Sequence, residues 1–78
     1  AALDYYRQSL AIKHEIGDRA GEARTLNNIG LAYQSLGNYA AALDYYQQSL
    51  VIKREIGDRI GEAAILNNID SVNQLLGN

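Results

Sequence analysis

The stretch LNNIGLAYQSLGNYAAALDYY, residues 26–46, contains two helical patterns joined by a short turn. In its first half, Leu26, Ile29, Tyr33 and Leu36 recur at intervals of three and four residues, which places them on one side of a helix. Gly37 and Asn38 then interrupt the pattern. Glycine suits the left-handed residue just past a helix end, and asparagine caps the start of the next helix, so this pair predicts a tight turn between helices.

The same pattern occurs twice, with a period of 40 residues. Residues 1–38 and 41–78 are identical at 27 of 38 aligned positions, and Gly-Asp or Gly-Asn pairs recur at residues 17–18, 37–38, 57–58 and 77–78. The pairs divide the chain into four expected helices, at about residues 1–16, 19–36, 39–56 and 59–76. Proline is absent and the β-branched residues do not alternate, so strands are not expected and the predicted fold class is all-α.

Composition excludes several classes of function. The chain has 78 residues and a net charge of −2, from 9 acidic and 7 basic residues spread along it, which gives no basic patch for nucleic acid or an anionic membrane. It has no cysteine for a disulfide or a thiolate metal site. No segment approaches the roughly 20 apolar residues that span a bilayer. We expect one small soluble, cytoplasmic unit that is a fragment of a longer protein.

The helix types differ in how many sides they need to bury. In residues 19–36 one stripe is apolar, and the opposite stripe is mostly polar. Residues 39–56 instead have two apolar stripes, which are formed by Tyr39, Ala42, Leu43, Tyr46 and Leu50 and by Ala41, Tyr45, Ile52 and Ile56. A helix with two apolar stripes needs two partners. The sequence therefore predicts a solenoid in which antiparallel helix pairs stack.

These residues resemble the tetratricopeptide repeat. Leu26-x2-Ile29-Gly30-x2-Tyr33 followed by Ala42-x3-Tyr46 is similar to the family pattern W-x2-L-G-x2-Y and A-x3-F, with Leu for Trp and Ile for Leu. The usual period is 34 and ends in Pro, whereas here it is 40 and Arg54 holds the Pro position. That variant is similar to repeats of kinesin light chains, cell-polarity adaptors and long bacterial arrays. HEAT or armadillo architecture is the alternative, against which Gly30, Tyr33 and Ala42 argue.

The resemblance also sets the order of the helices. Residues 1–16 and 39–56 match the second helix (B) of a motif and residues 19–36 and 59–76 its first helix (A), so the order is B-A-B-A, with one complete motif at about residues 21–54. Both ends are then expected to carry uncovered apolar stripes, formed by Leu3, Tyr6 and Leu10 and by Leu66, Ile69 and Leu76. Since such faces seldom stay exposed, we expect a homo-oligomer that forms by end-to-end stacking or by helix exchange.

No residue cluster predicts catalysis, a cofactor or a metal site. His14 is the only histidine and aligns with Arg54, which indicates a cation near a helix C-terminus. Six acids are interpreted as structural groups at helix termini: Glu15, Asp18, Glu22, Glu55, Asp58 and Glu62. Gly21 and Gly61 lack the Lys and the strand of a phosphate loop and are interpreted as sites of close packing. The six tyrosines are interleaved with apolar residues at helical spacing and are assigned to the core.

The polar stripe of the A helices is the best candidate for a binding site. In tetratricopeptide folds the A helices line the concave surface, and in the related adaptors asparagines of the LNN phrase hold the backbone of an extended peptide. The resemblance implies a peptide-binding site at these positions: Arg24, Asn27, Asn28, Leu31, Gln34, Ser35, Asn67, Asn68, Ser71 and Gln74. An asparagine amide offers both donors and an acceptor to a peptide unit, and Arg24 suits an acidic group. The Lys and Asn of the two-carboxylate clamp are replaced by Asn27 and Leu31, so no preference for acidic C-terminal tails is implied.

Two functional hypotheses remain. The first is a module that binds a protein or peptide partner on the concave face. The second is a structural repeat that stacks or swaps helices and has no dedicated ligand, in which the same amides bridge adjacent A helices.

The second copy departs from the first at one place, where LNNIGLAY becomes LNNIDSVN, residues 66–73. Gly30 and Tyr33 are expected to pack on the following B helix, and no B helix follows residues 59–76 within the sequence. Asp70 and Asn73 are therefore expected to face solvent or polar partners, as in a terminal cap. A degenerate internal repeat with an altered neighbour is the alternative.

Overall fold

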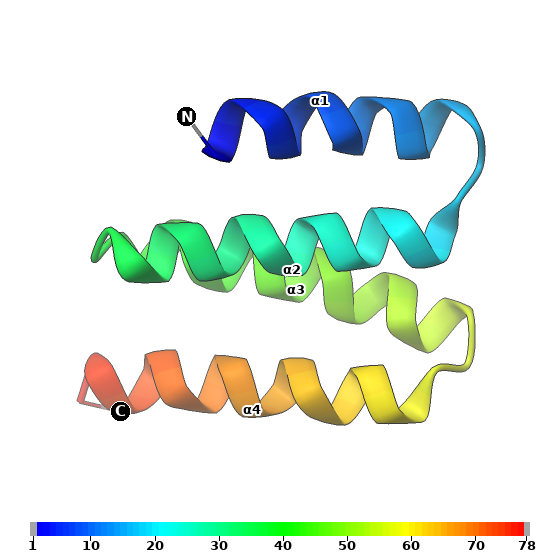
Figure 1. The fold of residues 1–78 in the computed structure, drawn as a ribbon. Helices are drawn as coiled ribbons and strands as arrows, with labels where there is room; N and C mark the ends of the chain where they lie inside the picture. Colours follow the sequence, from blue (N-terminus) through cyan, green and yellow to red (C-terminus); the bar gives the residue numbers. More distant parts are fainter. Residues whose placement is uncertain (1, 78) are drawn as a thin grey trace.

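The computed structural model describes residues 2–77, which form four helices that run antiparallel in succession (Figure 1). They are α1 (Ala2–Glu15), α2 (Arg19–Ser35), α3 (Tyr39–Glu55) and α4 (Arg59–Leu75). The all-α class with antiparallel helix pairs is confirmed. Each helix ends one residue before its expected end, and in α2, α3 and α4 that next residue is the C-cap. The expected start of the first helix at residue 1 lies outside the described residues.

The helix ends are built as the Gly-Asp and Gly-Asn pairs predict. At the end of α2, Gly37 has a φ of 79°, and the N–H of Asn38 donates to the carbonyl of Tyr33 at 2.9 Å. This bond, whose donor lies five residues after its acceptor, satisfies the carbonyl of Tyr33, which has no partner within the helix. The side chain of Asn38 then accepts from the N–H of Ala41, which caps α3. Each turn spans only three residues, so consecutive helices pack side by side.

Gly30 allows the closest approach between α2 and α3. A Cβ atom at Gly30 would lie 2.6 Å from two ring carbons of Tyr46, well inside van der Waals contact. The ring of Tyr46 is fully buried, and its hydroxyl donates to Gln34 at 2.7 Å. Burial raises the pKa of Tyr46, so the hydroxyl remains a donor. The expected packing of the small residue against the following helix is thus confirmed.

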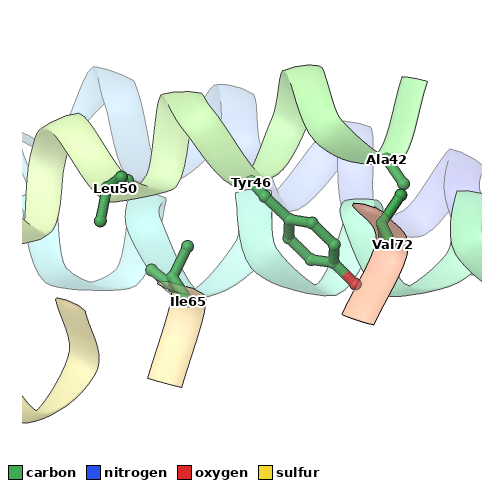
Figure 2. Packing of buried hydrophobic residues seen from close by; sticks show 5 residues of the cluster. All are labelled: Ala42, Tyr46, Leu50, Ile65 and Val72. Carbon is green, nitrogen blue, oxygen red and sulfur yellow. The ribbon is translucent and has the colours of Figure 1, made fainter. Parts of the chain in front are cut away.

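The two sides of α3 each contribute to a core cluster. On one side Ala42, Tyr46 and Leu50 point towards Ile65 and Val72 of α4 (Figure 2). On the other side Ile52 packs with Ala23 and Leu26 of α2, and Leu10 and Tyr45 cover that cluster in part. The prediction that this helix has two apolar sides is confirmed, with one exception. Ile56 is 42% exposed, because it is the C-cap of α3 rather than part of the helix.

The junction between α3 and α4 uses residues at which the two copies differ. Ile65 and Val72 are almost fully buried against α3, and they replace Thr25 and Ala32 of the first copy. The departure from the repeat therefore adds apolar contact on the side of α4 that faces α3. Asp70, in the same stretch, is exposed and accepts a hydrogen bond from Gln74 at 2.9 Å. The expectation that Asp70 is exposed or paired with a polar group is confirmed.

The expected uncovered stripe of the first helix was assigned to the wrong side. Leu3, Tyr6 and Leu10 are half-buried, because they correspond to the side of α3 that packs on the next A helix, and in α1 that side faces α2. The open side of α1 carries Tyr5 and Ile12, which are 72% and 55% exposed.

The apolar stripes of the A helices also need correction. Leu66 and Leu76 of the last stripe are exposed as expected, but Ile69 is half-buried against α3. Leu36, expected in the apolar stripe of α2, is 70% exposed, because the helix ends before it and Leu36 serves as the C-cap.

Candidate functional site

The predicted site residues lie on α2 and α4, and all of them retain access to solvent. Asn27, Asn28, Gln34 and Asn68 are half-buried, and the others are exposed: Arg24, Leu31, Ser35, Asn67, Ser71 and Gln74. None of the ten belongs to either core cluster. The polar stripe is therefore a surface of the molecule rather than part of its interior.

One side-chain hydrogen bond joins α2 directly to α4. The amide nitrogen of Asn68 donates to the side-chain oxygen of Asn27 at 3.0 Å. The two residues are 41 positions apart, whereas the repeat is 40 residues long. The bond therefore joins the second asparagine of one LNN phrase to the first asparagine of the preceding one. The side chains of Asn28 and Asn67 make no hydrogen bond within residues 2–77.

A small hollow opens beside this bond. Its volume is about 200 Å³, and residues from three helices line it: Arg24, Asn27, Lys53, Gly61, Ala64 and Ile65. Glycine at position 61 lets the side chain of Lys53 lie close to α4, since a Cβ atom there would lie 2.8 Å from Cδ and Cε of Lys53. The interpretation of Gly21 and Gly61 as sites of close packing is confirmed, and in both cases the close neighbours are the carboxylate of the capping aspartate and a lysine side chain of the preceding B helix.

Two cations of different character line the hollow. The ammonium of Lys53 lies 2.9 Å from a carboxylate oxygen of Asp58, and the side chain is only 15% exposed. Hydrogen bonding by the N–H of Gly61 and then by Lys53 lowers the pKa of Asp58, so this ion pair is present at neutral pH. Arg24 makes no hydrogen bond or salt bridge with the described part of the chain, and its guanidinium is exposed. It is the cation most available to a ligand.

The structure brings together only some of the predicted residues. Arg24 and Asn27 line the hollow, and Asn68 adjoins it through its bond to Asn27. Gln34 accepts a hydrogen bond from Tyr46, and Gln74 donates one to Asp70, so these two amides have partners inside the fold. Leu31, Ser35 and Ser71 are exposed and do not line the hollow.

Sequence reasoning missed Lys53, Gly61, Ala64 and Ile65 as parts of this surface. Lys53 lies on a B helix, whereas the predicted site comprised only the polar stripe of the A helices. A signal was present, since both copies carry a lysine five residues before the capping aspartate and a glycine three residues after it. Asp58 bonds both the Lys53 ammonium and the Gly61 N–H, which explains this spacing.

Five of the six acids at the helix termini form ion pairs within the fold: Asp18, Glu22, Glu55, Asp58 and Glu62. Glu22 and Glu62 are buried, and each contacts an arginine of its own helix and one side chain of the preceding helix: Arg19 and His14 for Glu22, Arg59 and Arg54 for Glu62. Among the described residues, no group of three or more His, Cys, Asp or Glu side chains could hold a metal ion. Within the same range, no helix is long and apolar enough to cross a membrane.

Comparison with protein families identifies the repeat. The family model described as tetratricopeptide repeat matches residues 1–55 and 21–78, which together cover the whole chain. A comparison with curated proteins gave no match. Repeats of this kind are non-catalytic modules that generally mediate protein–protein interactions. The match agrees with the close contact of Gly30 with Tyr46 and decides against HEAT or armadillo architecture, so the chain belongs to the tetratricopeptide repeat family.

Proposed function

We propose that the chain binds an extended segment of a protein partner along the surface formed by α2 and α4. The observation that supports this is the bonded pair Asn27 and Asn68, which lies beside a hollow with an exposed arginine at its edge. The finer features that the resemblance implies belong to the same proposal. They are the 40-residue variant of kinesin light chains, polarity adaptors and bacterial arrays, one complete motif at about residues 21–54, and the cytoplasm as the compartment.

The bonded asparagines keep capacity for a ligand. An asparagine side chain has two donor hydrogens and an oxygen that accepts twice. The bond between Asn27 and Asn68 uses one donor and one acceptor site, so the pair retains both kinds of group. A peptide unit needs one donor and one acceptor, which the remaining groups match. Bridging of adjacent A helices and peptide binding are therefore compatible at the same two residues.

The hollow favours an acidic or hydrogen-bond-accepting side chain of the bound segment. Arg24 supplies a planar set of donors that suits a carboxylate, and no hydrogen bond or ion pair within residues 2–77 uses these donors. Position 64, which corresponds to Arg24 in the second copy, is alanine, so the hollow has its arginine on the α2 side only. Such one-sided charge would fix the direction in which the segment lies.

The experiment uses the 78-residue chain and a displayed library of random peptides. Enriched peptides are tested against Arg24→Ala and against the double variant Asn28→Ala/Asn67→Ala, in which the amides without internal partners are removed. We expect each variant to weaken binding at least tenfold while the melting temperature stays unchanged. Gln47→Ala, an exposed amide on α3, is the matched control and should bind as the original chain does.

The same measurements separate binding from a purely structural role. Asn68→Ala removes the bond to Asn27, and we expect it to lower the melting temperature, unlike Asn28→Ala/Asn67→Ala. If no peptide is enriched, or if the enriched peptides bind Arg24→Ala and Asn28→Ala/Asn67→Ala as tightly as the original chain, the binding proposal is wrong.

The second candidate function is self-association through the terminal helices. The exposed apolar side chains of α1 and α4 favour it: Tyr5 and Ile12 on α1, and Leu66 and Leu75 on α4. Exposed apolar groups of this size often mark contact surfaces. Light scattering of the chain at tens of micromolar tests this candidate, and a mass equal to that of one chain would contradict it.

A further inference from the structure

The two open faces of the molecule are copies of the two faces that meet between α2 and α3. α4 aligns with α2 and keeps most of the residues by which α2 contacts α3: Arg59, Ala63, Leu66 and Gln74 for Arg19, Ala23, Leu26 and Gln34. α1 aligns with α3 and keeps the opposite side of the contact: Tyr5, Tyr6, Ser9, Ile12 and Glu15 for Tyr45, Tyr46, Ser49, Ile52 and Glu55. Tyr5, Ile12 and Glu15 are exposed, whereas Tyr6 and Ser9 are half-buried. A second copy of the chain thus offers α4 a helix similar to the one that covers α2.

Three polar contacts of the α2–α3 junction have counterparts on these open faces. Ser49 donates to the carbonyl of Ala23 at 2.7 Å, and the matching pair is Ser9 and Ala63. Tyr46 donates to Gln34, and Tyr6 and Gln74 match them.

The third contact is an ion pair. Arg19 pairs with Glu55, and the corresponding Arg59 and Glu15 are both exposed. Charge and hydrogen bonding are therefore complementary for a stack in which α1 of one copy lies on α4 of another.

The match fails at position 70. Gly30, its counterpart, has no room for a Cβ atom, because that atom would lie 2.6 Å from the ring of Tyr46. In the stack, the Cβ atom of Asp70 would overlap the ring of Tyr6 of the second copy. The carboxylate of Asp70 would also lose its contact with water, which costs free energy. A second contact is lost as well. Tyr33 stacks on Tyr45 with ring centroids 5.6 Å apart, and Asn73 replaces that tyrosine.

We propose that Asp70 is a stop residue, which prevents α1 of a second copy from docking on α4 in the α2–α3 geometry. A head-to-tail contact of this kind does not close on itself and would extend without limit, so blocking it prevents the chain from forming fibres. The inference does not depend on peptide binding. For the second candidate function, it excludes end-to-end stacking in the α2–α3 geometry and leaves other arrangements, helix exchange among them.

The test compares two double variants of the full chain by sedimentation velocity over a hundredfold range of concentration. Asp70→Gly/Asn73→Tyr restores both residues of the first copy, and we expect its mass to rise continuously with concentration. Asp70→Ala/Asn73→Tyr removes the charge but keeps the Cβ atom, and we expect its association to be at least tenfold weaker. The original chain should show no open-ended growth.

A charge exchange shows whether growth uses the proposed contact. In the Asp70→Gly/Asn73→Tyr background, Arg59→Glu should abolish growth, and the further change Glu15→Arg should restore it. Growth that is equal in the Gly and Ala variants, or growth of the original chain that Arg59→Glu abolishes, would overturn the proposal.

A stability measurement on a single-site variant tests the same contact without depending on the folding of α4 in the double variants. Gly30→Asp places the same carboxylate against Tyr46 in the α2–α3 junction, and we expect a clear loss of stability in urea. A Gly30→Asp chain as stable as the original would show that the junction tolerates aspartate, and the stop would be refuted. Peptide binding is measured on other residues, so the two proposals fail independently.

Discussion

Gly30 is the residue whose substitution tests the packing of α2 on α3 most directly. In an open helix, alanine is more favourable than glycine by about 1 kcal/mol. At this position, however, the added methyl group would displace the buried ring of Tyr46. We expect Gly30→Ala to lower the free energy of unfolding by about 1–3 kcal/mol, as overpacking does in other cores. Urea unfolding followed by circular dichroism measures the change.

Asp70→Ala is the matched control, because it places alanine at the corresponding exposed position of α4. Its free energy of unfolding should stay within about 0.5 kcal/mol of the original, as is usual for surface positions. If Gly30→Ala is as stable as the original chain or more stable, the close contact does not constrain the junction.

Single residues were predicted well where a backbone requirement or a missing neighbour decides their role. The exposure of Asp70 and the close approach at Gly30 follow from the repeat alone, since one copy has a following B helix within the sequence and the other has none. The burial of Val72 could not be predicted in this way. It depends on which side of α4 packs on α3. Because polar residues flank Val72, the sequence pattern gave no sign that this position is buried.

At the scale of the element, the starts of α2 and α4 carry a charged cap and the start of α3 a neutral one. Asp58 accepts from the N–H of Gly61 at 2.9 Å, as Asn38 accepts from Ala41 at 3.2 Å. The bond from Gly61, and then Lys53, lowers the pKa of Asp58 below its ordinary value of 3.8. The pKa of Asp18 is lowered for the same reasons, by Gly21 and Lys13.

The lowered pKa values predict a loss of stability in acid. The unfolded chain binds a proton at Asp58 at higher pH than the folded chain does, so the stabilisation is complete above the unfolded pKa, near the ordinary value of 3.8, and is lost as pH falls through the folded pKa. Asp58→Asn keeps an acceptor for Gly61 but does not titrate. We expect its melting temperature to fall less than that of the original chain between pH 5 and pH 2, as measured by circular dichroism.

Asn38→Asp gives the opposite change in the same kind of turn. It introduces a titrating cap at α3, and its melting temperature should fall more steeply in acid than that of the original chain. Parallel melting curves for Asp58→Asn and the original chain across this range would contradict the role of the caps.

The positions of the helices along the sequence were predicted more reliably than the side of each helix that faces its neighbours. The Gly-Asp and Gly-Asn pairs located every turn, because each supplies both a left-handed residue and a cap. The open side of α1 was assigned incorrectly, since two apolar stripes on a B helix look alike in the sequence. Only the position of the next A helix decides which stripe is covered.

At the scale of the molecule, α1 and α4 lie at the two edges and the α2–α3 pair lies between them (Figure 1). Within its described length, α1 has no buried residue, whereas both core clusters include residues of α3. Helices with little buried surface open locally at a lower free energy. We therefore expect amide hydrogen exchange to be fastest in α1 and slowest in α2 and α3, as followed by mass spectrometry of proteolytic fragments.

Within that experiment, α4 is an internal comparison, because it is also an edge helix but buries Ile65 and Val72. Its protection should exceed that of α1. Equal protection in α1 and α3 would show that the four helices open only as one unit.

The candidate site could be predicted only in part, since it is a property of the assembled molecule. The sequence identified Arg24, Asn27 and Asn68 through the polar stripe and the family resemblance. The hollow also needs Lys53 from a third helix, and its shape depends on the distance between α2 and α4. The bond between Asn27 and Asn68 joins positions that do not align between the repeats, so comparison of the two copies could not reveal it.

The three-residue turns have a consequence for how the molecule folds. α1 and α3 have nearly the same sequence, so their side chains alone do not decide which of them takes the place between α2 and α4. A link of three residues reaches only the adjacent helix, and each helix is therefore assigned its neighbour by connectivity. The sequence also has no proline that could isomerise slowly. Near-identical repeats can pair incorrectly during folding. In this chain, the three-residue turns allow each helix to pack only on its neighbour in sequence.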